Sequence, residues 1–329
     1  MGSAWLANGS ARREPDASTR SAATLRLVSA LPAPATRRRV RRELLDWYAA
    51  EHRHFPWRAT NDPYAVLVSE VMLQQTQAAR IAARFPRFMA HFPTLESLAS
   101  APAAAVLAEW SGLGYNRRAL TLQRTAVMVA RDGWPRDVAG LARLPGIGAY
   151  TARAVASLAF GIPVGVVDTN VRRWLLRRFG GPDQPARLQL ISDALAGHGR
   201  GPEVASWTHA TMEFGAAICR SREPRCGACP IARGCPSREA AVMIPVPRQP
   251  PLRGSDRAYR GATLRLLAAS SGHALQEREV LVNLAGAGGR IGPALDETGW
   301  ARVRDGLERD GLAHRSGGML RLGAATIGA

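Results

Sequence analysis

Residues 144–170 constrain this chain more than any other stretch, because one short helix there joins a glycine-rich turn to a carboxylate. The stretch begins with Leu144-Pro145-Gly146-Ile147-Gly148 and reaches Asp168. Glycine adopts positive φ readily and lets another backbone approach closely. A helix that starts after such a turn offers free N–H groups to a phosphate. The stretch predicts a phosphate-binding hairpin coupled to an acidic residue, although a helical corner shaped only by glycine explains the hairpin about equally well.

The net charge indicates a polyanionic partner. The formal charge is +18, and all 44 basic residues are Arg. Arginine suits bidentate phosphate contacts, and a GC-rich genome explains the choice of Arg over Lys but not the positive excess. No apolar run approaches the roughly 20 residues of a membrane span, and the first 42 residues lack the apolar segment of a secretory signal. We expect a cytoplasmic, nucleoid-associated monomer with no membrane partner, whose residues 1–35 are a disordered extension.

The first half of the chain predicts helices over residues 38–51 and 64–85. Asp62 and Pro63 form a helix start signal, with the aspartate as N-cap. Glu70 lies at the edge of the apolar face of the second helix. A charged Glu is seldom buried without a partner, but a solvated helical Glu is commoner, so Glu70 alone is a weak signal.

A glycine turn at residues 112–118 carries Tyr115 beside two arginines. An aromatic ring on such a turn is suited to stacking on nucleic-acid bases, and an ordinary loop tyrosine that covers the core is the alternative. Helices are expected over residues 117–132, 150–160 and 169–179. Asp168 begins the last of these as its N-cap, a position that favours the ionised carboxylate.

Four cysteines lie within seventeen residues, with the spacing Cys219-x6-Cys226-x2-Cys229-x5-Cys235. Such clustering in an intracellular protein indicates a metal site rather than a disulfide framework. Four thiolates suit a [4Fe–4S] cluster or a tetrahedral zinc ion, and ligand chemistry alone does not separate these two.

The C-terminal part predicts a separate small domain. Residues 239–256 are rich in proline and form a linker. Residues 257–329 then show three helical patterns and a hairpin with Ser316-Gly317-Gly318 at its turn, which indicates a winged-helix-like domain. Arg302, Arg304 and Arg309 on the third helix are candidates for DNA contact, and a solvated basic face explains them equally well.

Together these motifs resemble the adenine-specific DNA glycosylases of the helix–hairpin–helix, or endonuclease III-like, superfamily. The resemblance covers about residues 38–237 and looks like the actinobacterial branch. Its marks are Pro56-Trp57-Arg58, Ser69-Glu70-Val71-Met72-Leu73-Gln74-Gln75-Thr76, Gly112-Leu113-Gly114-Tyr115, Leu144-Pro145-Gly146-Ile147-Gly148, Val167-Asp168-x-Asn170 and the cysteine loop.

The resemblance implies an all-α, two-lobed glycosylase domain over residues 36–238 that binds double-stranded DNA. It implies removal of adenine mispaired with 8-oxoguanine or guanine in base excision repair, and a [4Fe–4S] cluster. The residues to which it assigns roles fall into four groups: a general acid, a sugar-facing carboxylate and an assisting tyrosine (Glu70, Asp168, Tyr150); DNA contacts (Gln75, Tyr115, Gly146, Gly148, Asn170); the adenine pocket (Trp57, Arg58, Leu73); and the cluster ligands (Cys219, Cys226, Cys229, Cys235).

The residue chemistry agrees with this implied reaction. A protonated Glu70 in a dry pocket can donate to a ring nitrogen of adenine. An ionised Asp168 can stabilise the sugar cation or trap it covalently, as paired carboxylates do in glycoside hydrolysis. The target base must first be flipped out of the duplex. Related bifunctional enzymes place a Schiff-base lysine where this chain has Tyr150, and the sequence contains no lysine, which predicts a monofunctional glycosylase.

Some features of the sequence do not decide which mispaired base is the substrate. Many members carry a C-terminal domain similar to oxidised-nucleotide hydrolases that reads 8-oxoguanine, whereas the tail here indicates a winged helix. Thr169 and Asn116 stand where Gly and a second Tyr are usual, and His209 stands where Glu or Gln is common near the adenine. A lone helical histidine is more often structural. The competing hypotheses are a thymine or uracil glycosylase at G mispairs and a non-catalytic iron–sulfur DNA-binding sensor.

Overall fold

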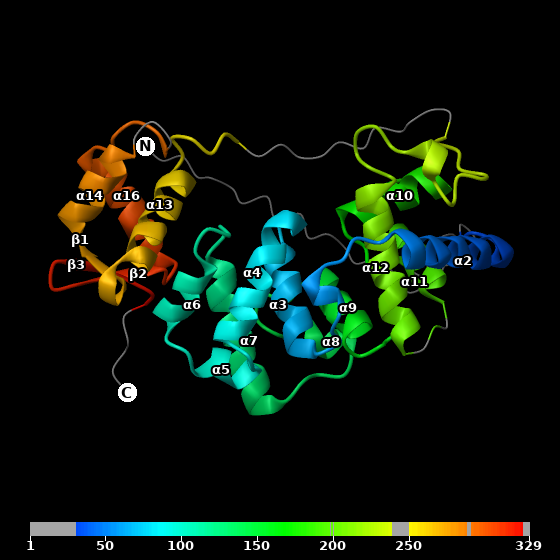
Figure 1. The fold of residues 1–329 in the computed structure, drawn as a ribbon, viewed down its shortest axis with the longest axis horizontal. Helices are drawn as coiled ribbons and strands as arrows, with labels where there is room; N and C mark the ends of the chain where they lie inside the picture. Colours follow the sequence, from blue (N-terminus) through cyan, green and yellow to red (C-terminus); the bar gives the residue numbers. More distant parts are fainter. Residues whose placement is uncertain (1–30, 198, 200, 239–249, 288–290, 325–329) are drawn as a thin grey trace, which may run out of the picture.

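The structure, a computed structural model, describes residues 31–324 except for 198, 200, 239–249 and 288–290. Most of the predicted N-terminal extension and most of the predicted linker lie outside the described residues. Within the described ranges the chain is mostly helical, in three groups that follow one another across the molecule (Figure 1). No described helix is long and apolar enough to cross a membrane.

The middle group surrounds one fully buried helix. All residues of α3 from Tyr64 to Met72 are buried, because α4, α7, α9 and the short 3-10 turn η1 pack around it. The core of this group includes Leu67, Phe88 and Trp110. Its elements are η1 (Pro56–Arg58), α3 (Pro63–Leu73), α4 (Ala78–His91), α5 (Leu95–Ser100), α6 (Ala103–Trp110), α7 (Arg117–Asp132), α8 (Val138–Leu141) and α9 (Ala149–Leu158).

A second group of helices brings together two segments that are far apart in sequence, residues 34–51 and residues 169–228. The N-terminal helix packs against helices that follow Asp168, around a separate core with Leu44, Trp174 and Phe214 at its centre. Residues far apart in sequence therefore build one lobe, and Asp168 enters it from the side of the middle group. The elements are α2 (Pro34–Glu51), α10 (Thr169–Phe179), α11 (Pro185–Ala196), α12 (Pro202–Ala217) and the 3-10 turn η2 (Cys226–Ala228).

The cap residues explain why the helices that carry the site begin where they do. The Asp62 carboxylate accepts from the N–H groups of Tyr64 and Ala65 at the start of α3. The Asp168 carboxylate accepts from the N–H of Val171 at the start of α10. Both N-caps were predicted, and α7 and α10 have the predicted bounds.

The prediction of one continuous helix over residues 64–85 was wrong. The chain leaves helical geometry between α3 and α4, where Gln75 has φ +54°. No Gly or Pro marks this break, and its cause is tertiary. The guanidinium of Arg118 donates to the carbonyls of Val71 (2.6 Å), Met72 (3.1 Å) and Gln74 (2.6 Å), which ends the helix there. The prediction that Glu70 lies at an edge was also wrong, because α3 has no exposed face.

The third group contains the only sheet in the described part of the chain. Three short antiparallel strands have the order β1-β3-β2, and Leu320 of β3 pairs with Leu275 and Arg315. The three helices and the hairpin were predicted, whereas β1 was not. Trp300, Val303 and Leu307 of the third helix are buried. The elements are α13 (Asp256–Ala269), the 3-10 turn η3 (Ser271–His273), β1 (Ala274–Gln276), α14 (Glu277–Gly286), α16 (Glu297–Arg309), β2 (Ala313–Ser316) and β3 (Met319–Leu322).

This C-terminal unit is packed onto the middle group rather than held only by a linker. α13 and β3 contact α6, and apolar residues of both groups form one continuous core. The unit therefore has a fixed position beside the loop that carries Tyr115.

Candidate functional site

Three predicted catalytic side chains meet where the first two helical groups join. Glu70 comes from buried α3, Tyr150 from the first turn of α9, and Asp168 from the start of α10. The Tyr150 hydroxyl lies beside Glu70 and lowers its pKa, and the same hydroxyl is 4.0 Å from Met212 Sδ. The second carboxyl oxygen of Glu70, Oε2, is buried and has no hydrogen-bond partner. An unpartnered buried polar atom is costly, so this oxygen is suited to a polar group of a bound ligand.

The two carboxyl groups differ in their hydrogen bonds. The pKa of Glu70 is raised to about 7, chiefly by burial; the Tyr150 hydroxyl lowers it, and the nearby Asp168 carboxylate adds a smaller upward contribution. Burial also raises the pKa of Asp168, while the N-cap hydrogen bond from Val171 lowers it, which is the direction expected of an N-cap position. However, Asp168 accepts from the Val171 N–H at 2.6 Å and from Asn170 Nδ2 at 2.9 Å. These donors favour the charged form of Asp168, whereas Glu70 Oε2 has no donor, so the hydrogen bonds favour Glu70 as the protonated member of the pair.

Asn170 connects Asp168 to the cysteine loop. Its Oδ1 accepts from Arg173 Nη2 at 2.9 Å, and Arg173 Nε donates to the carbonyl of Cys219 at 2.8 Å. A chain of hydrogen bonds thus runs from the Cys219 backbone to the Asp168 carboxylate. The Asn170 amide, predicted as a DNA contact, is engaged in this chain.

The hairpin has the predicted dependence on glycine. Gly146 has φ +70°, and a Cβ atom there would overlap Cγ2 of Thr121. Both the backbone angle and the close approach of α7 therefore require glycine. Gly148 is the N-cap of α9 and is exposed, with open space where a side chain would begin. Its exposure leaves the start of α9 open to an anion.

The backbones at Gln75 and Tyr115 are both held by the side chain of Arg118. Both have left-handed backbone angles, φ +54° and +48°, which non-glycine residues adopt only when their surroundings hold them there. Arg118 supplies that restraint, because it donates to carbonyls on the Gln75 side and to the carbonyl of Gly114 at 3.0 Å. Tyr115 is 39% exposed. Sequence reasoning noted Arg118 only as one of two arginines on this turn and missed its structural role.

The predicted adenine pocket is held by a carboxylate that sequence reasoning missed. Arg58 Nη2 donates to Glu213 Oε2 at 2.7 Å, and Arg53 Nε donates to Glu213 Oε1 at 2.5 Å. Glu213 on α12 is buried, and these arginines hold its pKa below the usual value against the effect of burial. Trp57 is buried and stacks on Phe55, while Leu73 is half-buried at the end of α3. His209 stays neutral, since burial lowers its pKa to about 3.

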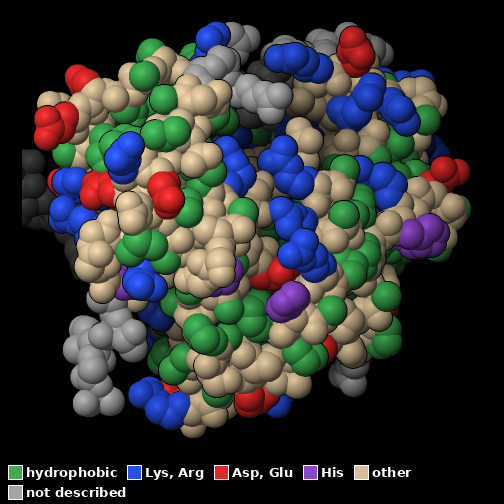
Figure 2. Space-filling model, turned by 60° about the vertical axis from the view of Figure 1, so that its left-hand side comes forward, with side chains coloured by type: hydrophobic (Ala, Val, Ile, Leu, Met, Phe, Trp, Pro, Cys, Tyr) green, Lys and Arg blue, Asp and Glu red, His purple; other side chains and the backbone are tan. Residues whose placement is uncertain are grey.

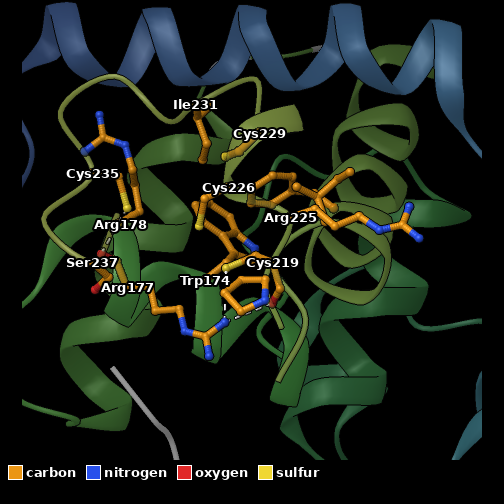
Figure 3. A pocket seen from close by; sticks show the side chains of 13 residues that line it. Trp174, Arg177, Arg178, Cys219, Arg225, Cys226, Cys229, Ile231, Cys235 and Ser237 are labelled. Atoms are coloured by element: carbon orange, nitrogen blue, oxygen red, sulfur yellow. Dashed lines mark hydrogen bonds between the residues drawn. The ribbon is translucent and has the colours of Figure 1, made fainter. Parts of the chain in front are cut away.

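The four cysteines line one cavity between α10 and the end of α12 (Figure 3). The remaining walls include the apolar side chains of Trp174, Phe214 and Ile231. The loop is fastened by arginines of α10: Arg177 Nη1 donates to the carbonyl of Arg220 at 2.5 Å and lies 3.7 Å from the sulfur of Cys219. Arg178 Nη1 donates to the carbonyl of Gly234 at 2.8 Å. These arginines were predicted on α10, but their contacts with the loop were not.

Comparison with known proteins identifies the family. Residues 68–194 match the HhH-GPD superfamily base excision DNA repair protein family. The chain is 42% identical over 242 residues to the adenine DNA glycosylase of Mycobacterium tuberculosis strain H37Rv, covering 69% of this chain and 78% of that protein. The chain belongs to the adenine DNA glycosylases. Its relatives are therefore hydrolases of N-glycosyl bonds, and the sensor hypothesis is not supported.

A human protein of the same name is also similar, and two solved structures of other DNA repair enzymes share the fold. The human adenine DNA glycosylase is 40% identical over 222 residues, covering 60% of this chain and 39% of that protein. The solved structure of a thermostable thymine-DNA glycosylase has a TM-score of 0.58 and 29% identity, covering 62% of this chain and 97% of that one. An endonuclease III–DNA covalent intermediate, at TM-score 0.51 and 24% identity, shares the fold and covers 60% and 93% of the two chains.

The cysteine cavity of this glycosylase has a lining that fits a thiolate-bound group. In the described part of the chain, no three Cys, His, Asp or Glu side chains are placed to hold one metal ion. The four cysteines nevertheless face one cavity whose other walls are largely apolar, with arginine donors beside the thiols. A large, thiolate-bound group with negative charge suits such surroundings.

Proposed function

We propose that this chain is a monofunctional glycosylase that removes adenine mispaired with 8-oxoguanine or guanine in double-stranded DNA. The observation that carries the proposal is the group of Glu70, Tyr150 and Asp168. One buried carboxyl oxygen there has no partner, and a second carboxylate accepts two hydrogen bonds that favour its charged form against the effect of burial. This is the pair of protonation states that N-glycosidic bond cleavage needs.

In the proposed mechanism, Glu70 is the general acid. It donates its proton to a ring nitrogen of the flipped adenine, and the C1′–N9 bond breaks with its electron pair leaving on the base. Asp168 stabilises the resulting oxocarbenium-like sugar, and a water oxygen then bonds to C1′ and releases a proton. Tyr150 orients Glu70 through its hydroxyl group.

Most of the remaining predicted residues keep their proposed roles around this centre, whereas the Asn170 side chain instead holds Asp168. Gln75 and Tyr115 enter the base stack where adenine is removed, and the open start of α9 behind Gly148 holds a phosphate. Trp57, Arg58 and Leu73 form the walls of the base pocket. Tyr150 occupies the place of a Schiff-base lysine, and the sequence contains no lysine, so lysine-mediated strand cleavage is not expected.

Cys219, Cys226, Cys229 and Cys235 would hold a [4Fe–4S] cluster, which would tie the loop of residues 226–235 to Cys219 just after α12. Iron and sulfide analysis of the purified protein tests this: about four of each per chain support the cluster, and one zinc ion without sulfide contradicts it. We also propose that the glycosylase domain spans residues 36–238, that the C-terminal unit is winged-helix-like, and that the protein is located at the nucleoid.

The function is tested by base release from four duplexes, with A opposite 8-oxoguanine, A opposite G, T opposite G, and U opposite G. We expect release of adenine only, strongest opposite 8-oxoguanine, with no strand cleavage. Asp168→Asn is the matched variant, since it keeps the shape of the cap and removes the charge. It is expected to bind DNA but lose turnover. Release of T or U, or a fully active Asp168→Asn protein, would overturn the proposal.

A further inference from the structure

A groove of about 1150 Å³ separates the C-terminal unit from the middle helical group. One wall is the glycine turn with Tyr115 and Arg117, together with Gln75 and Arg80. The other wall is the first half of α13 and the residues just before it. The groove lies at the opposite end of α3 from Asp62, beside the break that follows that helix. The proposed acid, carboxylate and tyrosine of the catalytic group do not line it.

The groove is strongly basic. Seven arginines line it, against the two carboxylates of Asp256 and Asp310. Asp310 is already paired with Arg260 and, at 3.6 Å, with Arg117. Asp256 is paired at 2.8 Å with Arg302. Among the described residues no carboxylate lies within ion-pair distance of the arginines at positions 80, 253 and 265. A band of basic side chains with few acidic ones among them is visible on the face drawn in Figure 2.

The geometry of α13 suits an extended chain of anions. Arg257, Gly261 and Arg265 follow one another at four-residue spacing, so they share one face of the helix. Arg257 and Arg265 are exposed, and eight residues of helix separate them by about 12 Å. This is roughly the length of three base steps along B-DNA. Gly261 between them has no side chain to obstruct the groove floor, where the atom nearest to a Cβ would be Arg265 Nη1 at 3.5 Å.

The groove is also continuous with a residue proposed to enter DNA. Arg257 Nη1 lies 3.5 Å from the hydroxyl oxygen of Tyr115, so the C-terminal unit touches this tyrosine directly. A strand that leaves the base stack at Tyr115 therefore meets the arginines of α13 next. By contrast, two of the three arginines predicted to contact DNA from α16 are engaged: Arg302 with Asp256, and Arg304 with Glu277 at 2.8 Å.

We propose that this groove binds the phosphodiester backbone of a DNA strand next to Tyr115, and that α13, not α16, is the DNA-contacting helix of the C-terminal unit. The inference rests on the proposed function for the placement of Tyr115 in DNA. The chemistry it requires is that of a row of phosphates, because guanidinium groups match phosphate oxygens in charge and shape.

The test measures the affinity of the full-length protein for an undamaged duplex as a function of salt. The triple variant Arg253→Ala, Arg257→Ala, Arg265→Ala removes the groove cations. The matched control, Arg278→Ala, Arg309→Ala, Arg321→Ala, removes three exposed arginines of the same unit that do not line the groove. A second pair, Gly261→Glu and Gly261→Ala, adds either a carboxylate or only a methyl group to the groove floor.

We expect the groove triple variant to bind at least about tenfold more weakly at low salt. The slope of log K against log salt should fall by roughly 2 to 3, since each lost phosphate contact removes about 0.9. Gly261→Glu should weaken binding and Gly261→Ala should not. Equal effects of the two triple variants, or an unchanged slope in the groove variant, would overturn the inference.

Adenine release by excess enzyme from the A:8-oxoguanine duplex separates this inference from the proposed function. If the wild type releases no adenine while the groove variants still bind more weakly, the proposed function fails and the groove assignment stands. If the wild type is active and the groove variants bind as tightly as it does, the groove assignment alone fails. Thermal unfolding of each variant confirms that the exposed substitutions leave the fold intact.

Discussion

Glu70 and Glu213 are both buried carboxyl groups, but their surroundings impose opposite charge states. Glu70 has the Tyr150 hydroxyl beside it and an unpartnered oxygen, and its pKa is raised to about 7, chiefly by burial. Glu213 lies between the guanidinium groups of Arg53 and Arg58, which keep its pKa below the usual value. The first group resembles an acid prepared for catalysis, and the second is a structural anion.

Substitution by glutamine should therefore have opposite effects on stability at the two sites. The pKa of Glu70 rises from an ordinary value of 4.5 to about 7 in the folded protein. Glu70 therefore adds to the free energy of unfolding below pH 4.5, and this contribution is lost as the pH rises through 7. At pH 8 we expect Glu70→Gln to stabilise the fold by up to about 3 kcal/mol, with no gain at pH 4. Glu213→Gln should cost about 3 kcal/mol at pH 8, because two arginines lose their partner. Denaturant unfolding at both pH values measures this, and a destabilised Glu70→Gln protein at pH 8 would contradict it.

The proton on the Glu70 carboxyl group should also set the pH dependence of adenine release. If Glu70 is the general acid, the single-turnover rate at saturating enzyme should be constant well below pH 7 and fall about tenfold per pH unit above it. Rapid-quench measurements from about pH 5 to 9 test this. A rate that rises with pH through 7 would instead make Glu70 a base.

At the scale of helices and loops, Arg118 on α7 joins two segments that are far apart in sequence. Its guanidinium ends α3 and holds the Tyr115 loop, and it lies over the rings of Trp110 and Tyr115. This half-buried cation is desolvated, which lowers its pKa to about 10. The left-handed angles of Gln75 and Tyr115 depend on these contacts.

Arg118→Met should accordingly destabilise the fold by at least about 2 kcal/mol, because several backbone carbonyls lose a charged donor. It should also weaken DNA binding through the loss of order at both loops. Arg117→Met is the control, since its side chain is 71% exposed and its ion pair is long, so a change within about 0.5 kcal/mol is expected. Denaturant unfolding compares the two variants.

Arg118→Lys keeps the charge but not the planar fork of the guanidinium group. Full wild-type stability in this variant would show that charge alone suffices.

Local sequence signals predicted the elements that depend on local chemistry. Asp62 and Asp168 start α3 and α10 because their carboxylates cap free N–H groups, a signal carried within a few residues. The break at Gln75 was missed because its cause, Arg118, lies more than forty residues away. The Glu213 clamp was missed for the same reason, since its arginines are about 160 residues distant. The three residues of β1 are too few for a pattern of alternation.

For the whole molecule, the question is how the C-terminal unit is held. The proline-rich stretch before it suggests an independent domain, yet α13 and β3 pack against α6 and share its apolar core. Gly323 lies at this contact, where a Cβ atom would be 3.3 Å from the backbone nitrogen of Ala104. The position of the unit, and with it the basic groove beside Tyr115, depends on that approach.

Gly323→Leu and Gly317→Leu form a matched pair that tests this packing. Both glycines have positive φ, so leucine brings left-handed strain at each site, but only Gly323 faces α6 while Gly317 has open space around it. We expect Gly323→Leu to cost about 1–3 kcal/mol more than Gly317→Leu, because its side chain must displace α6 or move the C-terminal unit away. Calorimetry should show one unfolding transition for the wild type and for Gly317→Leu, with a lower or divided transition for Gly323→Leu. If the two variants unfold alike, the C-terminal unit is held by its linker rather than by packing, and the groove has no fixed width.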